Sequence, residues 1–361
     1  MPKVLMKGNE AIAEAAIASG CRHYFGYPIT PQTEVAEYMA KRMPKVGGLC
    51  LQAESEIAAI NMVLGASAAG VRVMTSSSSP GIALKSEGIS YLVGSDLPCL
   101  ILNVQRGGPG LGGIQPAQSD YNLAVKSAGH GDSHMLVLAP SSIQEIVDLT
   151  SAAFDAGDKW RVPVMMLADG ALGQMMEPVD LSSIAKKSPP EKPWAASGHG
   201  GKRKKNIINS LYIEPDELER LVVERYARYA KIAEEETRWE EYRLDDAELA
   251  VVAYGITARI CKTAVDAARE KGIKVGLFRP ISLWPYPSEQ LDKACANVKQ
   301  VLVAELNMGQ MVDDVRLAIK CRLPVAFHGR TGGMLPTPED ILATIEKLVG
   351  DDSNTVPLGG K

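Results

Sequence analysis

Short apolar runs alternate with helical segments through most of the chain. The first half predicts strands over residues 23–27, 48–53, 71–75, 98–104, 135–139 and 162–168. Helices are expected between them, over residues 8–19, 33–44, 83–94 and 141–157 and from Ser55 to Gly70. Strands that alternate with helices in this way form a parallel sheet covered by helices on both faces. The sequence therefore predicts an α/β fold.

A second α/β pattern begins at Glu248. Its strands are expected over residues 249–254, 273–279, 299–304 and 323–327, and its helices over 257–271, 287–296, 310–321 and 337–349. A polar stretch with a basic run and a long charged helix over 214–242 separates the two patterns. We expect a first domain over residues 1–180, a linker over 181–247, a second domain over 248–350, and a disordered tail over 351–361.

The composition is that of a soluble globular protein with about two domains. The 361 residues are 46% hydrophobic and 23% charged, with a net charge of −4, which leaves no nucleic-acid footprint. The basic run 202–205 is more often a solvated loop than a binding patch. With no signal-peptide stretch and no apolar run long enough for a membrane span, we expect a cytoplasmic protein. None of the six cysteines forms a CxxC pair, so neither a zinc site nor an iron–sulfur cluster is indicated, and we expect free thiols.

Several polar residues are expected where strands of the first half end. Thr30, Glu56, the serines 76–79 and Arg106 each follow a predicted strand. Functional loops of parallel sheets lie beyond the carboxyl ends of the strands, so these residues are expected on one rim. Each also has an ordinary role: Thr30 could bond its own turn, and Arg106 could be a surface cation.

Glu56 is the most informative of these residues. It lies in the first turn of a predicted helix, behind the N-cap candidate Ser55, and nine positions before Gly65. Alanines make this helix thin, so another element can pack closely on it. An acidic residue at a helix start also complements the helix dipole, and that role stays open. Glu54 is a rival carboxylate, but only Glu56 has the spacing to Gly65 and Gly70 described next.

This strand–Glu–helix segment, with glycines nine and fourteen residues after Glu56, resembles the pyrimidine-binding domain of thiamine-diphosphate enzymes. Three further elements narrow the resemblance to the alpha-type subunit of 2-oxoacid:ferredoxin oxidoreductases. These are Tyr27-Pro28-Ile29-Thr30-Pro31, Gln105-Arg106-Gly107-Gly108-Pro109 and the start of the second domain at Val252-Ala253-Tyr254-Gly255. The resemblance covers roughly residues 1–180 and 248–345. It implies a pyrimidine-binding fold followed by a transketolase C-terminal-like domain, both parallel-sheet sandwiches.

The resemblance also implies roles for individual residues. Glu56 would bond N1′ of the aminopyrimidine and favour its imino tautomer, with Pro28 and Ile29 beside the cofactor. Thr30 and Arg106 would face the 2-oxoacid, since a guanidinium can bind a carboxylate with two parallel hydrogen bonds. The implied reaction is oxidative decarboxylation to the acyl-CoA, with coenzyme A as co-substrate and ferredoxin as electron acceptor.

The chain lacks the other half of the cofactor site. The Asp169-Gly170 pair follows Ala168 rather than glycine, and the first asparagine beyond it is Asn206, so it is no diphosphate–magnesium motif. We therefore expect no metal on this chain. A beta-type subunit would hold the diphosphate and Mg²⁺, alongside a gamma-type subunit and a ferredoxin-like subunit, with 4Fe-4S clusters on the partners.

Gly107 stands where 2-oxoglutarate enzymes of the family tend to carry threonine, which favours 3-methyl-2-oxobutanoate as substrate. A 2-oxoglutarate or pyruvate enzyme stays open. So do two other readings: a beta-type subunit of a thiamine-dependent dehydrogenase, against which the YPITP turn and Arg106 argue, and a non-catalytic α/β scaffold subunit.

Overall fold

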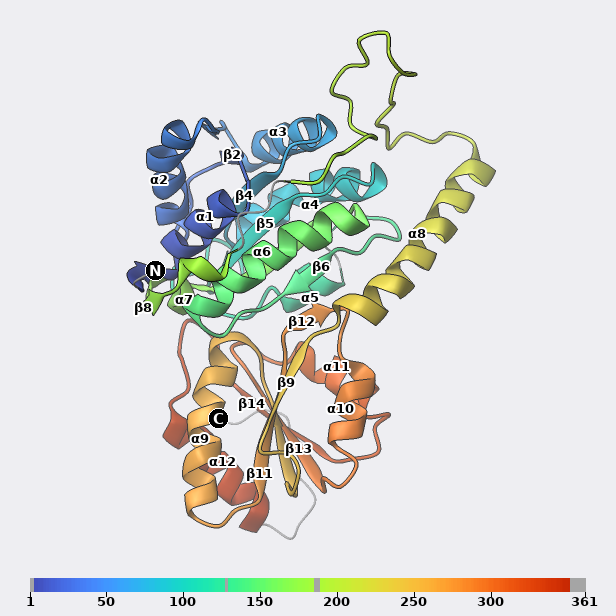
Figure 1. The fold of residues 1–361 in the computed structure, drawn as a ribbon. Coiled ribbons are helices and arrows are strands. Elements are labelled where there is room, and N and C mark those ends of the chain that lie inside the picture. The colour runs from blue at the N-terminus through green and yellow to red at the C-terminus, as the bar shows by residue number, and fades with distance from the viewer. Residues whose placement is uncertain (1–2, 127–128, 185–188, 351–361) are drawn as a thin grey trace.

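The computed structural model describes residues 3–126, 129–184 and 189–350. The predicted disordered tail, 351–361, lies outside the described residues. Two α/β units are stacked one above the other, and the long helix α8 (Pro215–Glu236) runs beside the first unit down to the junction between them (Figure 1). The predicted fold class, two parallel-sheet units, is confirmed.

The first unit is built on a seven-stranded sheet with the order β12-β6-β7-β5-β4-β2-β3. Its strands are β2 (His23–Gly26), β3 (Leu49–Gln52), β4 (Val73–Ser77), β5 (Leu100–Gln105), β6 (Leu136–Leu138), β7 (Val164–Asp169) and β12 (Ser282–Trp284). All neighbours pair in parallel except β12, which runs antiparallel to β6. β4, β5 and β7 are buried along their whole length, as expected of parallel strands covered on both faces.

Helices cover both faces of this sheet. α3 (Glu56–Ala68) and α4 (Ser79–Gly94) pack on one face, and α1 (Gly8–Ala18), α2 (Thr33–Arg42) and α6 (Ile143–Trp160) pack on the other. Smaller elements complete the unit: η1 (Met43–Val46), α5 (Tyr121–Val125), α7 (Gly170–Gln174), η2 (Leu181–Ser183), and the antiparallel pair β1 (Val4–Lys7) and β8 (Met176–Val179). Sequence periodicity missed these short elements because none spans two turns or an alternating run.

The second unit has a five-stranded sheet with the order β14-β13-β10-β11-β9. The parallel strands are β10 (Leu249–Val252), β11 (Val275–Pro280), β13 (Gln300–Glu305) and β14 (Val325–Gly329). Its helices are α9 (Gly255–Glu270), α10 (Ser288–Ala294), α11 (Met311–Ala318) and α12 (Pro338–Gly350). The edge strand β9 (Trp239–Tyr242) is antiparallel to β11.

Strand β9 corrects one prediction. The helix expected over 214–242 ends at Glu236, and Thr237 adopts an extended backbone. Trp239 and Tyr242 favour strands, and β9 is fixed by its ladder to β11 and by the Arg279 Nε–Glu240 Oε2 contact of 2.7 Å. The predicted helix was too long because residues 239–242 pair with β11, a strand distant in sequence, and no local pattern reveals that pairing.

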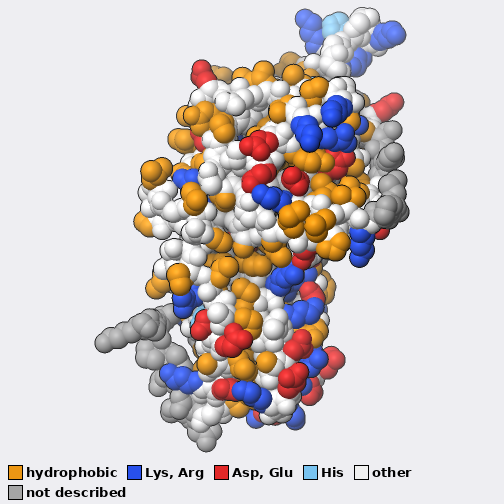
Figure 2. All heavy atoms as spheres, turned by 90° about the vertical axis from the view of Figure 1, so that its left-hand side faces the viewer, with side chains coloured by type: hydrophobic (Ala, Val, Ile, Leu, Met, Phe, Trp, Pro, Cys, Tyr) orange, Lys and Arg blue, Asp and Glu red, His pale blue; other side chains and the backbone are white. Residues whose placement is uncertain are grey.

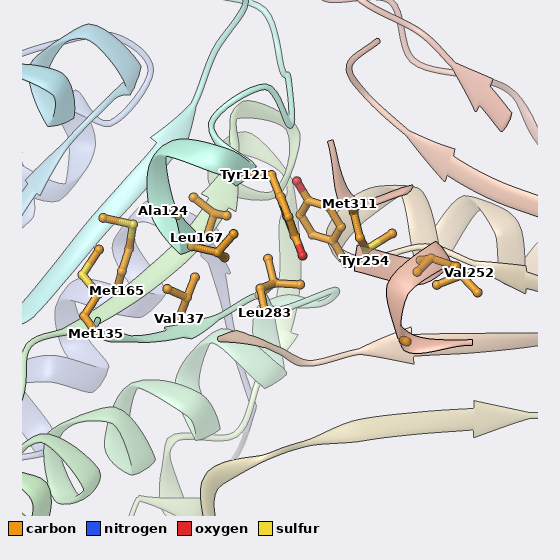
Figure 3. Packing of buried hydrophobic residues seen from close by; sticks show 14 of the residues in the cluster. Tyr121, Ala124, Met135, Val137, Met165, Leu167, Val252, Tyr254, Leu283 and Met311 are labelled. Carbon is orange, nitrogen blue, oxygen red and sulfur yellow. The ribbon is translucent and has the colours of Figure 1, made fainter. Parts of the chain in front are cut away.

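The two units share a continuous apolar interior. Figure 3 shows Tyr121 and Tyr254 facing each other at the junction, with Leu283 and Met311 beside them. The two tyrosine rings lie 5.8 Å apart. The second unit therefore packs on the first through buried side chains.

The basic run 202–205 is exposed, as the solvated-loop interpretation predicts. Figure 2 shows this loop projecting from the top of the molecule, with lysine and arginine side chains gathered on it. In the part of the chain that the structure describes, no helix is both long and apolar enough to cross a membrane.

Candidate functional site

Glu56 is buried at the start of α3. The Ser55 hydroxyl caps this helix by accepting a hydrogen bond from the Ala58 amide at 3.1 Å, as predicted. The Glu56 residue is only 6% exposed. A Cβ added to Gly81 of α4 would lie 2.7 Å from Glu56 Oε1 and 2.1 Å from Ser77 Oγ. Only glycine at position 81 therefore lets the carboxylate lie against the first turn of α4.

The neighbours of Glu56 distinguish it from its rival. Glu54 is exposed, on the loop before α3. Gly65 faces open space on the outer side of α3, and Gly70, with φ +90°, ends the helix one residue after its C-cap, as predicted. The carboxylate with the predicted spacing to the two glycines is thus the buried one.

Two serine hydroxyls between β4 and α4 are buried without partners, and Ser77 Oγ, like Glu56 Oε1, lies against Gly81. Ser77 ends β4 and Ser78 is the residue before α4, and both are fully buried. Neither Oγ makes a hydrogen bond. Buried polar atoms are almost always satisfied, so these hydroxyls are suited to a ligand with polar groups of its own.

The turn Tyr27–Pro31 follows β2 on the same rim. Pro28 and Thr30 are exposed and Ile29 is half-buried. The turn is tied to β4 through the buried Gln32, whose Nε2 donates to the Tyr27 carbonyl at 3.2 Å. Gln32 Oε1 in turn accepts from the Ser76 hydroxyl at 2.5 Å. The three predicted residues of this turn are therefore held at the ends of β2 and β4.

Arg106, at the end of β5, is buried and points back to this turn. Its Nη1 donates to the Thr30 carbonyl at 2.9 Å, and its Nη2 donates to the Leu111 carbonyl at 3.0 Å. Its Nε is buried without a partner. Arg106 is thus a positioned guanidinium with donor capacity left, rather than a surface cation.

The first turn of α4 contacts both Glu56 and Arg106. The Arg106 amide donates to Ser79 Oγ at 3.1 Å, and Gly81 lies against the Glu56 carboxylate. Glu56, Thr30 and Arg106 are therefore brought to one rim, as predicted from the strand ends.

A cavity of about 430 Å³ opens beside Arg106. Glycines 107, 108 and 110 line one side, and Asn307, Met308 and Thr331 of the second unit line another. Asp120 also lines it, and its Oδ2 accepts from Ser79 Oγ at 2.6 Å and from Asn103 Nδ2 at 2.9 Å. Burial raises the pKa of Asp120, against the lowering effect of these bonds and of the Arg106 charge.

Gln118 anchors the loop after Arg106 to the second unit. Its Nε2 donates to the Tyr254 carbonyl at 2.8 Å, and its Oε1 accepts from Thr257 Oγ1 at 2.8 Å and from the Leu306 amide at 3.1 Å. Sequence analysis missed Gln118 and Asp120 because the stretch between Arg106 and α5 has no periodic pattern.

Asp169 has a different role from that of a diphosphate motif. Its Oδ1 accepts from the Ala171 and Leu172 amides at 2.9 and 3.1 Å, which caps α7. Burial raises its pKa to about 6. Within the described residues, no three His, Cys, Asp or Glu side chains are grouped in a way that could hold a metal ion.

Comparison with known families identifies the chain. Residues 14–240 match the family model for the thiamine-diphosphate-binding region of pyruvate flavodoxin/ferredoxin oxidoreductases. The chain belongs to this family. Residues 247–341 match core domain II of pyruvate:ferredoxin oxidoreductase. The chain is thus a subunit of a thiamine-dependent 2-oxoacid:ferredoxin oxidoreductase.

Several relatives match over nearly the whole chain. The ketoisovalerate oxidoreductase subunit VorB of Methanothermobacter thermautotrophicus is 47% identical, over 98% of this chain and 100% of the relative. The 2-oxoglutarate synthase subunit KorA of Methanocaldococcus jannaschii is 37% identical, over 93% and 97% of the two chains.

Two solved structures are similar. The 2-oxoglutarate:ferredoxin oxidoreductase of Magnetococcus marinus, with 2-oxoglutarate, coenzyme A and succinyl-CoA bound, has a TM-score of 0.84 at 30% identity. The match covers 96% of this chain and 65% of that one. A split-gene transketolase in an inactive tetramer has a TM-score of 0.59 at 14% identity, covering 95% and 96%, which is a likeness of fold alone.

Proposed function

We propose that this chain is the alpha-type subunit of an enzyme that oxidatively decarboxylates 3-methyl-2-oxobutanoate to its acyl-CoA, with ferredoxin as electron acceptor. The observation that carries the proposal is the buried Glu56 carboxylate at the start of α3, in a chain 47% identical to a ketoisovalerate oxidoreductase subunit.

The residues around Glu56 fit the aminopyrimidine of thiamine diphosphate. An aminopyrimidine presents ring nitrogens and an amino group, and this pocket offers a carboxylate and the partnerless hydroxyls of Ser77 and Ser78. Gly81 keeps the space beside the carboxylate free of a side chain. When bound, the cofactor supplies the nucleophilic carbon, C2 of its thiazolium.

Glu56 holds the proton at N1′ of the ring through a charge-assisted hydrogen bond. Its burial strengthens that bond, because a hydrogen bond is stronger where the dielectric is low. Pro28 and Ile29, on the turn after β2, would lie beside the ring. Glu56 is therefore the residue of this half-site that holds the proton, and Pro28 and Ile29 of the turn orient the ring.

Arg106 binds the substrate carboxylate. The Thr30 and Leu111 carbonyls fix its guanidinium, so little side-chain entropy is lost on binding. Nε and the second hydrogens of the Nη atoms remain as donors. Thr30, exposed on the rim, faces the 2-oxoacid with its hydroxyl.

The cavity beside Arg106 favours an apolar substrate side chain. Pro80, Ala83, Leu123 and Met308 line it, and Asp120 is its carboxylate. A second carboxylate on the substrate, as in 2-oxoglutarate, would approach Asp120 and be repelled when Asp120 is ionised. This agrees with the substrate that Gly107 favours.

Other chains complete the site. With Asp169 engaged in capping α7, the diphosphate and Mg²⁺ are assigned to a beta-type subunit, and the 4Fe-4S clusters to partner chains that include the gamma-type and ferredoxin-like subunits. Exposed apolar side chains lie on β3, α3 and α4, the elements before, at and beside Glu56: Leu49, Leu51, Ile57, Met62 and Leu84. They offer the beta-type subunit a surface to cover.

The test is to assemble the enzyme with and without its partners. The chain alone should bind thiamine diphosphate poorly and contain no stoichiometric iron, whereas the complex should reduce ferredoxin with 3-methyl-2-oxobutanoate and coenzyme A. Activity or iron in the isolated chain would overturn the half-site assignment. A higher kcat/KM for 2-oxoglutarate or pyruvate would overturn the substrate assignment alone.

A further inference from the structure

A lysine is buried behind the Glu56 pocket. Lys85 lies on α4, and none of its surface is exposed. Its Nζ donates to Thr75 Oγ1 at 2.7 Å and to the Ser76 carbonyl at 3.1 Å. Both acceptors are neutral. A buried ammonium held only by neutral acceptors is costly, so a charge at this position calls for a counter-charge.

The position of Lys85 on α4 directs it toward Glu56. Gly81 lies one turn before Lys85 on the same helix face, and Gly81 contacts the Glu56 carboxylate. The titratable groups that face Lys85 are Glu56 of α3 and the buried Cys99 before β5.

We propose that Lys85 is a positioning residue for the reaction: its buried ammonium is the counter-charge of the Glu56 carboxylate and holds that carboxylate in place toward N1′ of the aminopyrimidine. This inference rests on the proposed function of Glu56. It adds a second buried charge to the half-site.

The protonation equilibria of the neighbours support this role. Burial lowers the pKa of Lys85 to about 7, opposed by the Glu56 charge. Burial raises the pKa of Cys99 to about 12, so the thiol stays neutral near pH 7. Glu56 is then the counter-ion of Lys85. The ammonium is present below about pH 7 and is lost as the pH rises above it, so the effect on Glu56 must decline over the same range.

The chain itself provides a control. Lys192 is another buried lysine, paired with Asp158 at 2.6 Å, and its side chain contacts the position of Gly70. Gly70 lies at the far end of α3 from Glu56, about 20 Å away along the helix. A change from lysine to methionine at 192 removes a buried charge without touching the pocket.

The experiment compares Lys85→Met and Lys192→Met with the wild type, in the assembled complex loaded with thiamine diphosphate. The exchange rate of the cofactor C2 proton and the near-ultraviolet circular dichroism of the bound pyrimidine are followed from pH 6 to pH 9. Lys85→Met should slow exchange about tenfold at pH 6, within the range of coupling between neighbouring buried groups, and the difference should vanish by pH 9. Lys192→Met should follow the wild type throughout.

Two further variants separate this inference from the function on which it rests. In a Glu56→Gln background, Lys85→Met should change nothing further, since the coupled partner is gone. If Glu56→Gln leaves exchange and circular dichroism intact, the proposed function fails. If Glu56→Gln abolishes exchange but Lys85→Met behaves like Lys192→Met, or slows exchange equally at every pH, the role of Lys85 is overturned and that of Glu56 stands.

Discussion

The guanidinium of Arg106 donates to the main-chain carbonyl of Thr30 at 2.9 Å, which joins residues 76 positions apart. The contact uses the backbone of Thr30 and leaves its hydroxyl free. The turn after β2 and the end of β5 are thereby fixed relative to each other before any substrate arrives.

Replacing Arg106 with methionine should reduce kcat/KM for the 2-oxoacid while thiamine diphosphate stays bound. The lost charge-assisted contact should cost about 2–4 kcal/mol of transition-state stabilisation. Steady-state kinetics and cofactor content of the assembled enzyme check this. Arg220→Met, which removes a surface cation paired with Glu224 on α8, is the control. Unchanged kinetics in Arg106→Met would return Arg106 to a structural role.

Glu56→Gln should nearly abolish turnover and C2 proton exchange, because the amide keeps the shape but lacks the negative charge that holds the proton at N1′. Glu54→Gln, two residues earlier and exposed, is the matched control and should retain both. Proton exchange followed by nuclear magnetic resonance on the loaded complex decides between them. The reverse pattern would mean that Glu54 is the cofactor carboxylate.

Gly81→Ala should impair the pocket without altering a charge. The new Cβ would lie 2.7 Å from Glu56 Oε1 and 2.1 Å from Ser77 Oγ, so the carboxylate must move. A misplacement on the order of 1 Å can cost about a hundredfold in rate. Gly65 of α3 faces open space, so Gly65→Ala is the control. It should stabilise α3 in the isolated chain by about 0.5–1 kcal/mol. Equal turnover in Gly81→Ala and wild type would show that the Glu56 carboxylate does not need the space beside Gly81.

Lys85 should make the stability of the isolated full chain depend on pH. Its pKa is lowered to about 7 in the folded chain from 10.5, so between these values the unfolded chain binds more protons. The free energy of unfolding of the wild type should therefore rise relative to Lys85→Met from pH 7 to pH 10, by a few kcal/mol at most. Urea unfolding at pH 6, 8 and 10 measures the difference. Parallel pH curves for the two proteins would contradict it.

Much of this site could be predicted because its residues follow strands. Thr30, Glu56 and Arg106 each lie within four residues of the end of a strand, and the carboxyl ends of parallel strands share one edge. The N-cap Ser55 could be predicted too, since capping is local chemistry. Gln118 could not, because its partners, Tyr254, Thr257 and Leu306, are more than 130 positions away.

Lys85 illustrates a different limit. A lysine on a helix is usually exposed, and its neighbour Leu84 is exposed instead. The sequence of α4 contains small and apolar residues on several sides, so periodicity does not reveal which face is covered. Likewise, β9 and β12 are fixed by pairing with distant strands. The local sequence of β9 favours a helix, and the local sequence of β12 shows no pattern, so neither strand could be predicted.

The antiparallel strand β12 belongs by sequence to the second unit but pairs with β6 of the first. Strand β6 would otherwise be the open edge of the seven-stranded sheet, a template to which other chains can add. A polypeptide that ends before residue 248, whether by cleavage or by interrupted synthesis, leaves that edge uncapped. Until Ser282–Trp284 has been synthesised, the main-chain groups on that side of β6 therefore have no strand partner, so the sheet of the first unit is completed only by residues of the second.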